Sequence, residues 1–349
     1  MPLIGYACPP GSVTHGERHE VAYCLGECKN PCVSPPLLNA IYRAERENHH
    51  VGAYISASML TDDGNCARQV VYERTYPFFE YPRNRWWAFR GTLGHSLVEA
   101  AGVGMEAYGW EQELRMSVPL TYPELPAPIL DPETGEFTGQ YDTTRPLNFT
   151  LGGTTDALNV LRGELHDFKS MADAKVVMTV QGNKGGTFNP QLDDKWVWQL
   201  NIYRWLVAHT PIPHDVRARF DLKGEFYPAP TKLVIQGFSM MDLLQTGTSV
   251  QVKVPAGKWS KYVMYDVGEI PLIPLDEIEA YIRPRALKWF KYLVLGEHAP
   301  VVGEEGKWLC RFCCFNGELV DGERCMPTAE RARGERVPGP KPVKDAPYP

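Results

Sequence analysis

The sequence predicts an α/β protein with a central mixed sheet flanked by helices. Two observations support this prediction: strand-like segments and helical segments alternate along the chain, and the composition suits a folded core. Of the 349 residues, 44% are hydrophobic and 22% are charged, which is ordinary for a globular protein. A chain of this length can hold two average domains or one large domain with insertions.

Helical periodicity is clearest at residues 92–108, 193–209 and 275–296, and it is also present between residues 36 and 80. Pro284 is expected to kink or interrupt the last of these helices.

Strand-like alternation occurs at residues 110–120, 149–161, 164–170 and within 230–271. A two-residue turn at Arg162-Gly163 is expected to join the second and third of these strands. Residues 121–148 contain five prolines and the turn sequence DPETG, so they are expected to form an inserted surface loop.

Three parts of the chain differ in composition. Residues 1–49 form a Cys-rich N-terminal extension, whose first 36 residues look too irregular for a hydrophobic core. Residues 50–326 are expected to form one domain, and residues 327–349 a loosely ordered tail rich in Pro, Arg and Glu. No apolar run is long enough for a membrane span, and MPLIGYACPP lacks the regions of a signal peptide. A cytoplasmic protein without a membrane partner is therefore expected.

The net charge of −6 gives no global sign of nucleic-acid binding, although a phosphate-binding groove needs only a local positive field. One local candidate is the segment PRNRWWAFRG, in which Arg83, Arg85 and Arg90 lie among aromatic residues. Such residues can hold phosphates and stack bases, and they are equally typical of a surface helix with tryptophans in the core.

The segment GELHDFKS places Asp167 and Lys169 two residues apart in a predicted strand, so their side chains share one face. The predicted turn would put Asp156 opposite Lys169 and diagonal to Asp167, on that face. Taken alone, the acid and the lysine also fit an ion pair on a solvated strand. Two carboxylates and a lysine together fit a Mg²⁺ or Mn²⁺ ion that activates water and stabilises a phosphoryl oxyanion.

Two pairs of residues on predicted helices extend this set. His95 and Glu99, in GHSLVE, are four residues apart, and an imidazole ligand would favour Mn²⁺ or a similar metal. Gln199 and Tyr203, in WQLNIYRW, have the same spacing. By itself, a helical histidine also fits a cap or a core position, and a Gln/Tyr pair also fits a hydrogen-bonded helix surface.

The motifs GHSLVE, GGTTDAL, ELHDFKS and QLNIY, in this order, resemble those of the PD-(D/E)XK nuclease superfamily and, within it, of the RecB-like nucleases. The resemblance runs from about Ile55 to Cys325, most of the chain. Each motif is weak alone, and four in order with compatible spacing are specific. The resemblance implies a PD-(D/E)XK restriction-endonuclease-like core and makes residues 50–326 a RecB-like nuclease domain.

The resemblance also implies roles for individual residues. His95, Asp156 and Asp167 would be metal ligands, assisted by the carbonyl of Phe168, and Lys169 would be the catalytic lysine. Three helical residues would complete the catalytic set, and the last two correspond to the family's helix that positions DNA or the lysine: Glu99, Gln199 and Tyr203. One departure is Asp167, because Glu is commoner at that position; the shorter side chain keeps the charge and shifts the ion slightly.

Cysteines cluster at both ends of the chain, which in a reducing compartment indicates metal binding rather than disulfides. Cys66 precedes the motifs, and Cys310, Cys313 and Cys325 follow the last helix. This layout resembles the iron–sulfur subgroup of these nucleases, which includes CRISPR-adaptation exonucleases, the AddB nuclease domain and a eukaryotic mitochondrial exonuclease. It implies a 4Fe–4S cluster, with zinc as the alternative metal and Cys314 as an alternative ligand to Cys313.

Four further cysteines lie outside the resemblance, in the N-terminal extension: Cys8, Cys24, Cys28 and Cys32. A structural Zn²⁺ ion would suit four thiols in such a segment, and His15 or His19 could replace one of them. Plain free thiols fit the segment equally well.

The motifs together predict a divalent-metal-dependent deoxyribonuclease that hydrolyses phosphodiester bonds. An exonuclease acting on single-stranded or frayed DNA ends is favoured, in recombination, repair, or phage or CRISPR DNA processing. The expected partners are DNA and a helicase, a recombinase or a CRISPR-adaptation protein. The alternatives are a site-specific endonuclease within a larger complex and a non-catalytic DNA-binding scaffold subunit, against which the intact acidic residues and lysine argue.

Overall fold

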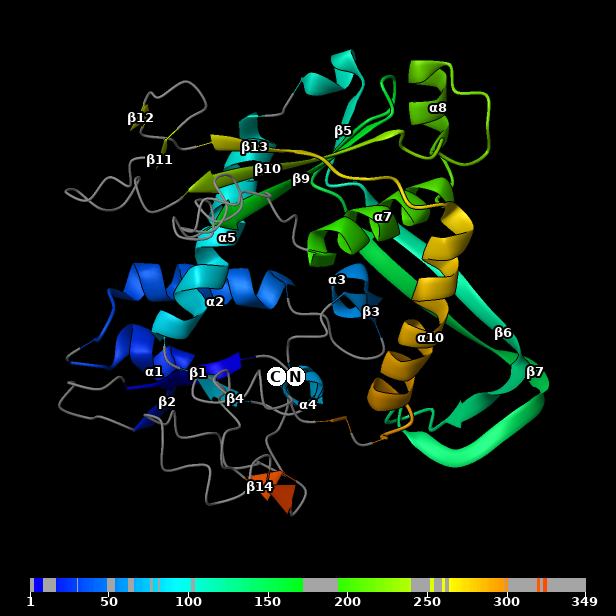
Figure 1. Cartoon of the computed structure of the whole chain (residues 1–349). Helices are drawn as coiled ribbons and strands as arrows, with labels where there is room; N and C mark the ends of the chain where they lie inside the picture. The colour runs from blue at the N-terminus through cyan, green and yellow to red at the C-terminus, as the bar shows by residue number, and fades with distance from the viewer. Residues whose placement is uncertain are drawn as a thin grey trace.

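Figure 1 shows the computed structural model of the chain, in which helices flank mixed β-sheets. The structure describes residues 3–8, 17–29, 31–48, 54–61, 66–75, 78–80, 82–101, 104–171, 194–239, 252–253, 259–260, 264–297, 299–300, 319–320 and 323–324. The prediction of an α/β protein with mixed sheets flanked by helices is confirmed. Among the described residues, no helix is both long and apolar enough to cross a membrane.

The central sheet is mixed and has five strands in the order β13-β10-β9-β8-β5. Their bounds are Trp110–Gln112 (β5), Ala157–Asn159 (β8), Glu164–Met171 (β9), Lys232–Ser239 (β10) and Met264–Glu269 (β13). Strand β9 runs parallel to β10 and antiparallel to β8. The central strands carry fully buried Leu165, Leu233 and Ile235, the pattern of strands inside a sheet.

Two long helices, α5 (Pro82–Ala101) and α7 (Asp194–Ala208), contact β9 of this sheet, and a third, α10 (Leu275–Leu293), packs against α7 (Figure 1). The predicted helices at 193–209 and 275–296 are confirmed, and α5 begins ten residues before the predicted start at residue 92. Helix α10 continues through Pro284, where an interruption or a kink was expected. The fully buried Ile282 and Ala286 on either side of the proline anchor the helix in the core.

A long two-stranded hairpin projects from the body of the molecule, and it consists of β6 (Arg115–Leu130) and β7 (Phe137–Thr154) (Figure 1). The prediction of a surface loop at residues 121–148 is therefore wrong. Prolines are compatible with these strands because the edges of a two-stranded ribbon need no donor from every residue. The base of the hairpin joins β3 (Ile55–Ser56), which pairs with β7 in parallel.

The tip of the hairpin is the DPETG sequence, which does form the turn that it predicts. The Oδ1 atom of Asp131 accepts hydrogen bonds from the backbone N–H groups of Glu133 and Thr134, at 2.9 and 2.8 Å. Gly135 follows with a φ of 72°, which glycine adopts without strain. An aspartate that bonds the backbone ahead of it is a common way to close a turn.

The N-terminal region forms a small unit of its own. A three-stranded sheet is built from β1 (Leu3–Ala7), β2 (Arg18–Glu20) and β4 (Phe78–Glu80), next to α1 (Val21–Gly26) and α2 (Pro35–Asn48). Five of its residues form a buried hydrophobic cluster: Leu3, Tyr6, Val21, Leu38 and Phe78. The expectation that residues 1–36 make no hydrophobic core is therefore wrong, because β1 pairs with β4, a strand far along the chain.

The remaining described elements are short. They are α3 (Ala57–Leu60), α4 (Ala67–Thr75), the 3₁₀ helix η1 (Met105–Tyr108), α8 (His214–Phe220), β11 (Val252–Lys253), β12 (Trp259–Ser260), β14 (Leu319–Val320) and β15 (Glu323–Arg324). The predicted tail at residues 327–349 lies outside the described residues, and the predicted domain boundaries stay a prediction.

Candidate functional site

The turn between β8 and β9 is longer than the sequence predicted. Strand β8 ends at Asn159 and β9 begins at Glu164, and these two residues pair with each other. Continuing this register by three residues puts Asp156 opposite Asp167, so the predicted pairing of Asp156 with Lys169 is wrong. The shift is two residues, and a shift of two leaves each side chain on its original face. Asp156, Asp167 and Lys169 therefore still share one face.

Local hydrogen bonds explain why the turn is longer. The Oδ1 atom of Asn159 accepts hydrogen bonds from the backbone N–H groups of Leu161 and Arg162, at 3.1 and 3.0 Å. These bonds close a compact turn before Gly163, whose φ of 65° lies in the left-handed region. The sequence reading placed the turn on Gly163 correctly and missed the role of Asn159.

Asp156 lies between helix α5 and strand β9 and contacts both. Its Oδ1 atom is 3.1 Å from Nδ1 of His95, and its Oδ2 atom accepts a hydrogen bond from the backbone N–H of Phe168 at 2.5 Å. The hydrogen bond to Asp156 raises the pKa of His95 above its usual value, although burial opposes this shift. The structure thus brings together one residue from each of the first three motifs: His95, Asp156 and Phe168.

Asp167 is the most buried carboxylate of this group, with 4% of its surface exposed. Burial raises the pKa of Asp167 to about 6; the charge of Lys169 opposes this shift, and nearby Asp156 adds to it. The Nζ atom of Lys169 lies 3.1 Å from Oδ1 and 2.8 Å from Oδ2 of Asp167. The Oδ2 contact lacks hydrogen-bond geometry, and no other described residue donates to this buried oxygen. Oδ2 is therefore an oxygen that a cation could use.

Helix α7 holds the lysine from the other side. The Nζ atom of Lys169 donates to Oε1 of Gln199 at 3.0 Å, and Nε2 of Gln199 donates to the hydroxyl of Tyr203 at 3.1 Å. Burial, followed by the charge of Asp167, raises the pKa of Tyr203, so its hydroxyl stays protonated. The predicted Gln/Tyr pair therefore forms one chain of contacts with the lysine and the aspartate.

The position of α7 is fixed by polar contacts that the motifs do not reveal. The side chain of Asn201, fully buried, donates to the backbone carbonyls of Val197 and Pro271 and accepts from the N–H of Ile273. A buried amide with all these partners holds one helix position relative to the sheet. Gly153 adds a close approach, because a Cβ atom there would lie 2.8 Å from the ring of Tyr203.

A cleft of about 780 Å³ opens beside His95 and Asp156. Its other walls come from α5, β6 and β7, and they include the side chains of Arg115, Ser117 and Thr154. Hydroxyl groups and a guanidinium can bind phosphate oxygens. The cleft is therefore lined by both acidic and cationic side chains.

Glu113 is a residue of this cleft that the sequence reading missed. It has a φ of 46°, uncommon for a residue other than glycine, and its N–H donates to the carbonyl of Asp156 at 3.2 Å. Burial raises the pKa of Glu113, and the carboxylates of Glu99 and Asp156 add to the shift. Glu99, which the resemblance made catalytic, is exposed and is not among the residues that line the cleft. The only signal in the sequence was an acid within the predicted strand at residues 110–120; in the structure Glu113 lies between β5 and β6.

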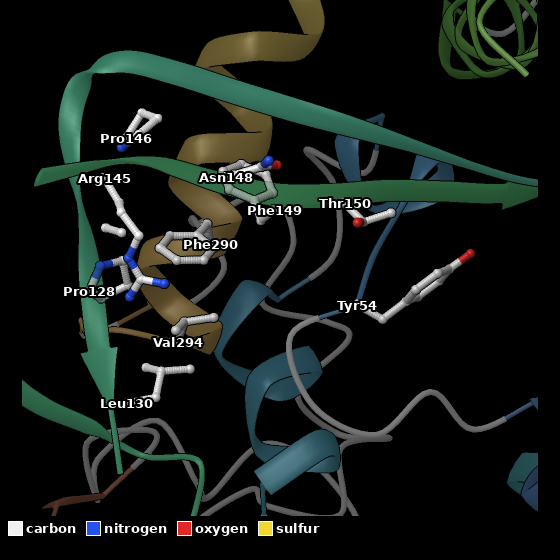
Figure 2. A pocket seen from close by; sticks show the side chains of 11 residues that line it. Tyr54, Pro128, Leu130, Arg145, Pro146, Asn148, Phe149, Thr150, Phe290 and Val294 are labelled. Atoms are coloured by element: carbon white, nitrogen blue, oxygen red, sulfur yellow. The ribbon is translucent and has the colours of Figure 1, made fainter. Parts of the chain in front are cut away.

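A second cavity, of about 750 Å³, lies between the hairpin and α10 (Figure 2). Phe149 of β7 and Phe290 of α10 stack there with ring centroids 4.7 Å apart, and Arg145 lies beside them. Tyr54 lines both this cavity and the cleft at His95. The two hollows are therefore neighbours along one side of the molecule.

Of the other residues predicted from the sequence, some lie in the described part of the chain and others do not. Arg85 forms ion pairs with Glu80, at 2.8 Å, and with Glu73, at 3.2 Å, which favours a structural role. The side chains of Arg83 and Arg90 lie outside the described residues, as do all the cysteines after Cys66. In the part of the chain that the structure describes, no three His, Cys, Asp or Glu side chains are already arranged to hold a metal ion.

The sequence matches no family model and no curated protein. Among solved structures, one similar chain is titled "Crystal structure of SSO0001". It is 14% identical, the match covers 80% of this chain and 93% of that chain, and the TM-score is 0.37. A likeness at this level carries no argument about fold or function.

Proposed function

We propose that the protein is a divalent-metal-dependent deoxyribonuclease that hydrolyses phosphodiester bonds, on a PD-(D/E)XK restriction-endonuclease-like core. The observation that carries this proposal is the convergence of Asp156, Asp167 and Lys169 on one sheet face, with His95 on one side and Gln199 on the other. These residues come from four separate sequence motifs. Their meeting beside a polar cleft is more than a single ion pair requires.

The donor set fits a hard divalent cation. Two adjacent carboxylates and one imidazole are oxygen and nitrogen donors that Mn²⁺ accepts, and two carboxylates alone suit Mg²⁺. The buried Oδ2 of Asp167 and the raised pKa of this group show a negative charge with too little compensation. A cation held by His95, Asp156 and Asp167 would supply that compensation, activate water and polarise a phosphoryl oxygen.

The residues of the chain have distinct tasks in this proposal. Lys169, held between Asp167 and Gln199, orients the attacking water or neutralises the charge that develops on the phosphoryl oxygens. Gln199 and Tyr203 keep the ammonium group in place, and we expect them to act as positioning residues. Arg115, at the wall of the cleft, binds a neighbouring phosphate.

The two neighbouring cavities support a single strand or a frayed end as substrate. The cleft at His95 can receive the scissile phosphate, and the cavity at the hairpin offers stacked aromatic rings and the guanidinium of Arg145. Aromatic faces and a cation are what unpaired bases and their backbone bind. An exonuclease on such ends is therefore preferred over a site-specific endonuclease.

A 4Fe–4S cluster on Cys66, Cys310, Cys313 and Cys325 is the second part of the proposal. Cys66 is buried, and Arg68 in the following helix donates to the carbonyls of Ala299 and Pro300, at 2.9 and 3.3 Å. The chain ten residues before Cys310 is thus held close to Cys66. The cluster would join two distant segments and stabilise the fold, since phosphodiester hydrolysis requires no electron transfer.

The catalytic assignment is tested with Asp156→Asn and Asp167→Asn. Purified protein with Mn²⁺ should degrade end-labelled linear single-stranded DNA, and each variant should lose this activity while keeping its circular-dichroism spectrum. Asp221→Asn, at an exposed aspartate with a lysine two residues later, is the matched control and should keep full activity. An unchanged rate in either site variant contradicts the assignment, and an inactive wild type favours the scaffold alternative.

A circular single-stranded substrate separates the two enzymatic alternatives. An exonuclease should leave the circle intact and degrade the linear form, because a circle offers no end. Opening of the circle by wild type, with no cutting by Asp167→Asn, would establish the endonuclease alternative instead.

The cluster has its own test. Protein purified without oxygen should be brown, and Cys66→Ser should lose the colour and lower the melting temperature. A colourless wild type that contains zinc and no iron would contradict the iron–sulfur assignment and leave the nuclease assignment intact.

A further inference from the structure

Four cysteines of the N-terminal unit lie at four places in its fold. Cys8 directly follows β1, Cys24 lies in α1, Cys28 lies two residues after the end of α1, and Cys32 lies before α2. These elements surround the same small sheet (Figure 1). Cys8, Cys24, Cys28 and Cys32 therefore belong to one small part of the fold.

Backbone hydrogen bonds fix the positions of two of these cysteines. The N–H of Cys8 donates to the carbonyl of Glu17 at 2.8 Å, which extends the pairing of β1 with β2 by one residue. The N–H of Cys28 donates to the carbonyl of Tyr23 at 3.0 Å, which keeps Cys28 close to the last turn of α1. Cys24 and Cys28 are therefore neighbours at the end of this helix.

The segments that carry the four thiols pack against one another. Helix α1 contacts β1, β2 and α2, and α2 contacts β1. Cys8, Cys24 and Cys28 are partly buried in this arrangement, and Cys32 is exposed. A divalent cation among thiolates would replace their mutual repulsion with a shared attraction.

The hydrophobic cluster of this unit is small. It has five buried members among the described residues, and the partly buried Cys24 packs against them. So small a core contributes little stability, and small units commonly add a metal ion or disulfides. None of the described cysteines forms a disulfide.

We propose that Cys8, Cys24, Cys28 and Cys32 bind one structural Zn²⁺ ion as four thiolate ligands. Zinc suits such a set because it accepts four sulfur ligands in a tetrahedron and does not change oxidation state. Among the described residues no three such side chains already form a metal-binding group, so the proposal requires the thiols to move together when the ion binds. This site is separate from the proposed cation at Asp167 and from the cluster at Cys66, and it does not depend on the nuclease activity.

The test uses the full chain, reduced and freed of metal, with Zn²⁺ alone as the probe. N-ethylmaleimide labels each thiol, and peptide mass spectrometry reads the labelling of each cysteine separately. Zn²⁺ should slow the labelling of all four N-terminal thiols together by about tenfold or more, and a chelator should restore it, because bound thiolates do not react. Labelling that is equally fast with and without Zn²⁺ overturns the proposal. Protection of only three of the four overturns the four-thiolate assignment.

A double variant provides a second measurement that does not depend on labelling. Cys24→Ser with Cys28→Ser should bind one Zn²⁺ fewer than wild type, by elemental analysis, and should lose the rise in melting temperature that Zn²⁺ gives. Cys310→Ser with Cys313→Ser is the matched control and should keep Zn²⁺ protection of Cys8 and Cys32. Equal zinc content in wild type and the Cys24/Cys28 variant contradicts the proposal. If that variant does not fold, the labelling of wild type still decides.

Discussion

Among the described residues, two Asp-x-Lys sequences have a lysine that contacts the aspartate, and the surroundings of the two pairs differ completely. Asp167 and Lys169, in β9, have side chains that are 6% and 21% exposed. Asp221 and Lys223, just after α8, form an ion pair with side chains that are 85% and 82% exposed. The residue types and their spacing are the same, so burial and neighbours must account for any difference in function.

The exposed pair has the properties of an ordinary surface ion pair, which contributes little to stability because water screens it. Burial of Asp167 raises its pKa to about 6, even with a lysine in contact. Asp156 and Gln199 add a second carboxylate and a third contact for the lysine. The two pairs have the same residue types and spacing. Burial and neighbouring side chains on the sheet therefore account for the perturbed pKa of Asp167.

The largest expected effect separates the two lysines. Lys169→Ala should reduce Mn²⁺-dependent DNA hydrolysis by about 10³-fold, because it removes the cation beside the developing phosphoryl charge. Lys223→Ala should leave the rate within experimental error, since its ammonium group is 82% exposed and is paired only with a surface aspartate among the described residues. Single-turnover rates on end-labelled DNA measure both variants. Equal losses of rate in Lys169→Ala and Lys223→Ala would contradict the distinction between the buried and the exposed pair.

The next effect concerns the contact that only the buried lysine has. Gln199→Ala should lower kcat by about 10- to 100-fold with little change in KM, because it leaves Lys169 less well oriented. Gln69→Ala is the matched control, since Gln69 also bonds a residue four positions later on a helix, Glu73 at 2.9 Å. Steady-state kinetics distinguish the two parameters. A rise in KM with unchanged kcat would indicate that Gln199 binds DNA instead of positioning the lysine.

The sequence identified His95, Asp156, Asp167, Lys169 and Gln199, which the structure brings together, but it did not identify Glu113 or the pairing of β8 with β9. Periodicity located α7 and the strand of Asp167, and the spacing of two residues placed Asp167 and Lys169 on one face. The turn was misjudged by two residues, because Asn159 bonds the backbone of the turn and such side-chain contacts leave no periodic signal. The same face was kept only because the error was an even number of residues.

Contacts between distant segments account for what else was missed. The long β6–β7 hairpin was read as a loop because its prolines disfavour an internal strand, although an edge strand tolerates them. The N-terminal core was missed because Leu3 packs near Phe78, a partner far along the chain. Glu113 carries no motif, and only its place in the cleft identifies it.

The third prediction compares the two aspartates through their effect on stability. In metal-free protein the pKa of Asp167 is raised from 3.8 to about 6, so the folded state holds a proton that the unfolded chain releases. The ionised carboxylate of Asp167 therefore destabilises the folded protein above about pH 6. This destabilisation disappears as the pH falls from about 6 to about 4, because the carboxylate becomes protonated. The melting temperature of wild type should rise by a few degrees relative to Asp167→Asn as the pH is lowered from 7 to 5.

Calorimetry with a chelator present measures this difference. The control is Asp221→Asn: because Asp221 is 85% exposed, the difference between wild type and this variant should stay constant over the same pH range. A constant difference for Asp167→Asn as well would mean that burial does not disfavour its charge. Saturating Mn²⁺ should remove the pH dependence seen with Asp167, because the cation compensates the carboxylate.

The smallest expected effect extends the comparison to an exposed ion pair that lies beside a cavity. Arg145 pairs with Asp142 at 2.6 Å and is 70% exposed, much like Lys223, and it also lines the cavity at Phe149 and Phe290 (Figure 2). If a strand of DNA passes there, Arg145→Ala should weaken the binding of single-stranded DNA by about threefold. It should also reduce the slope of log affinity against log salt by about 1, because one phosphate contact is lost.

Arg219→Ala, at another exposed and ion-paired arginine, is the control and should change neither the affinity nor the slope. Binding titrations at several salt concentrations decide between the two outcomes. An unchanged slope in Arg145→Ala would show that this exposed pair, like Asp221 and Lys223, lies away from the path of the substrate.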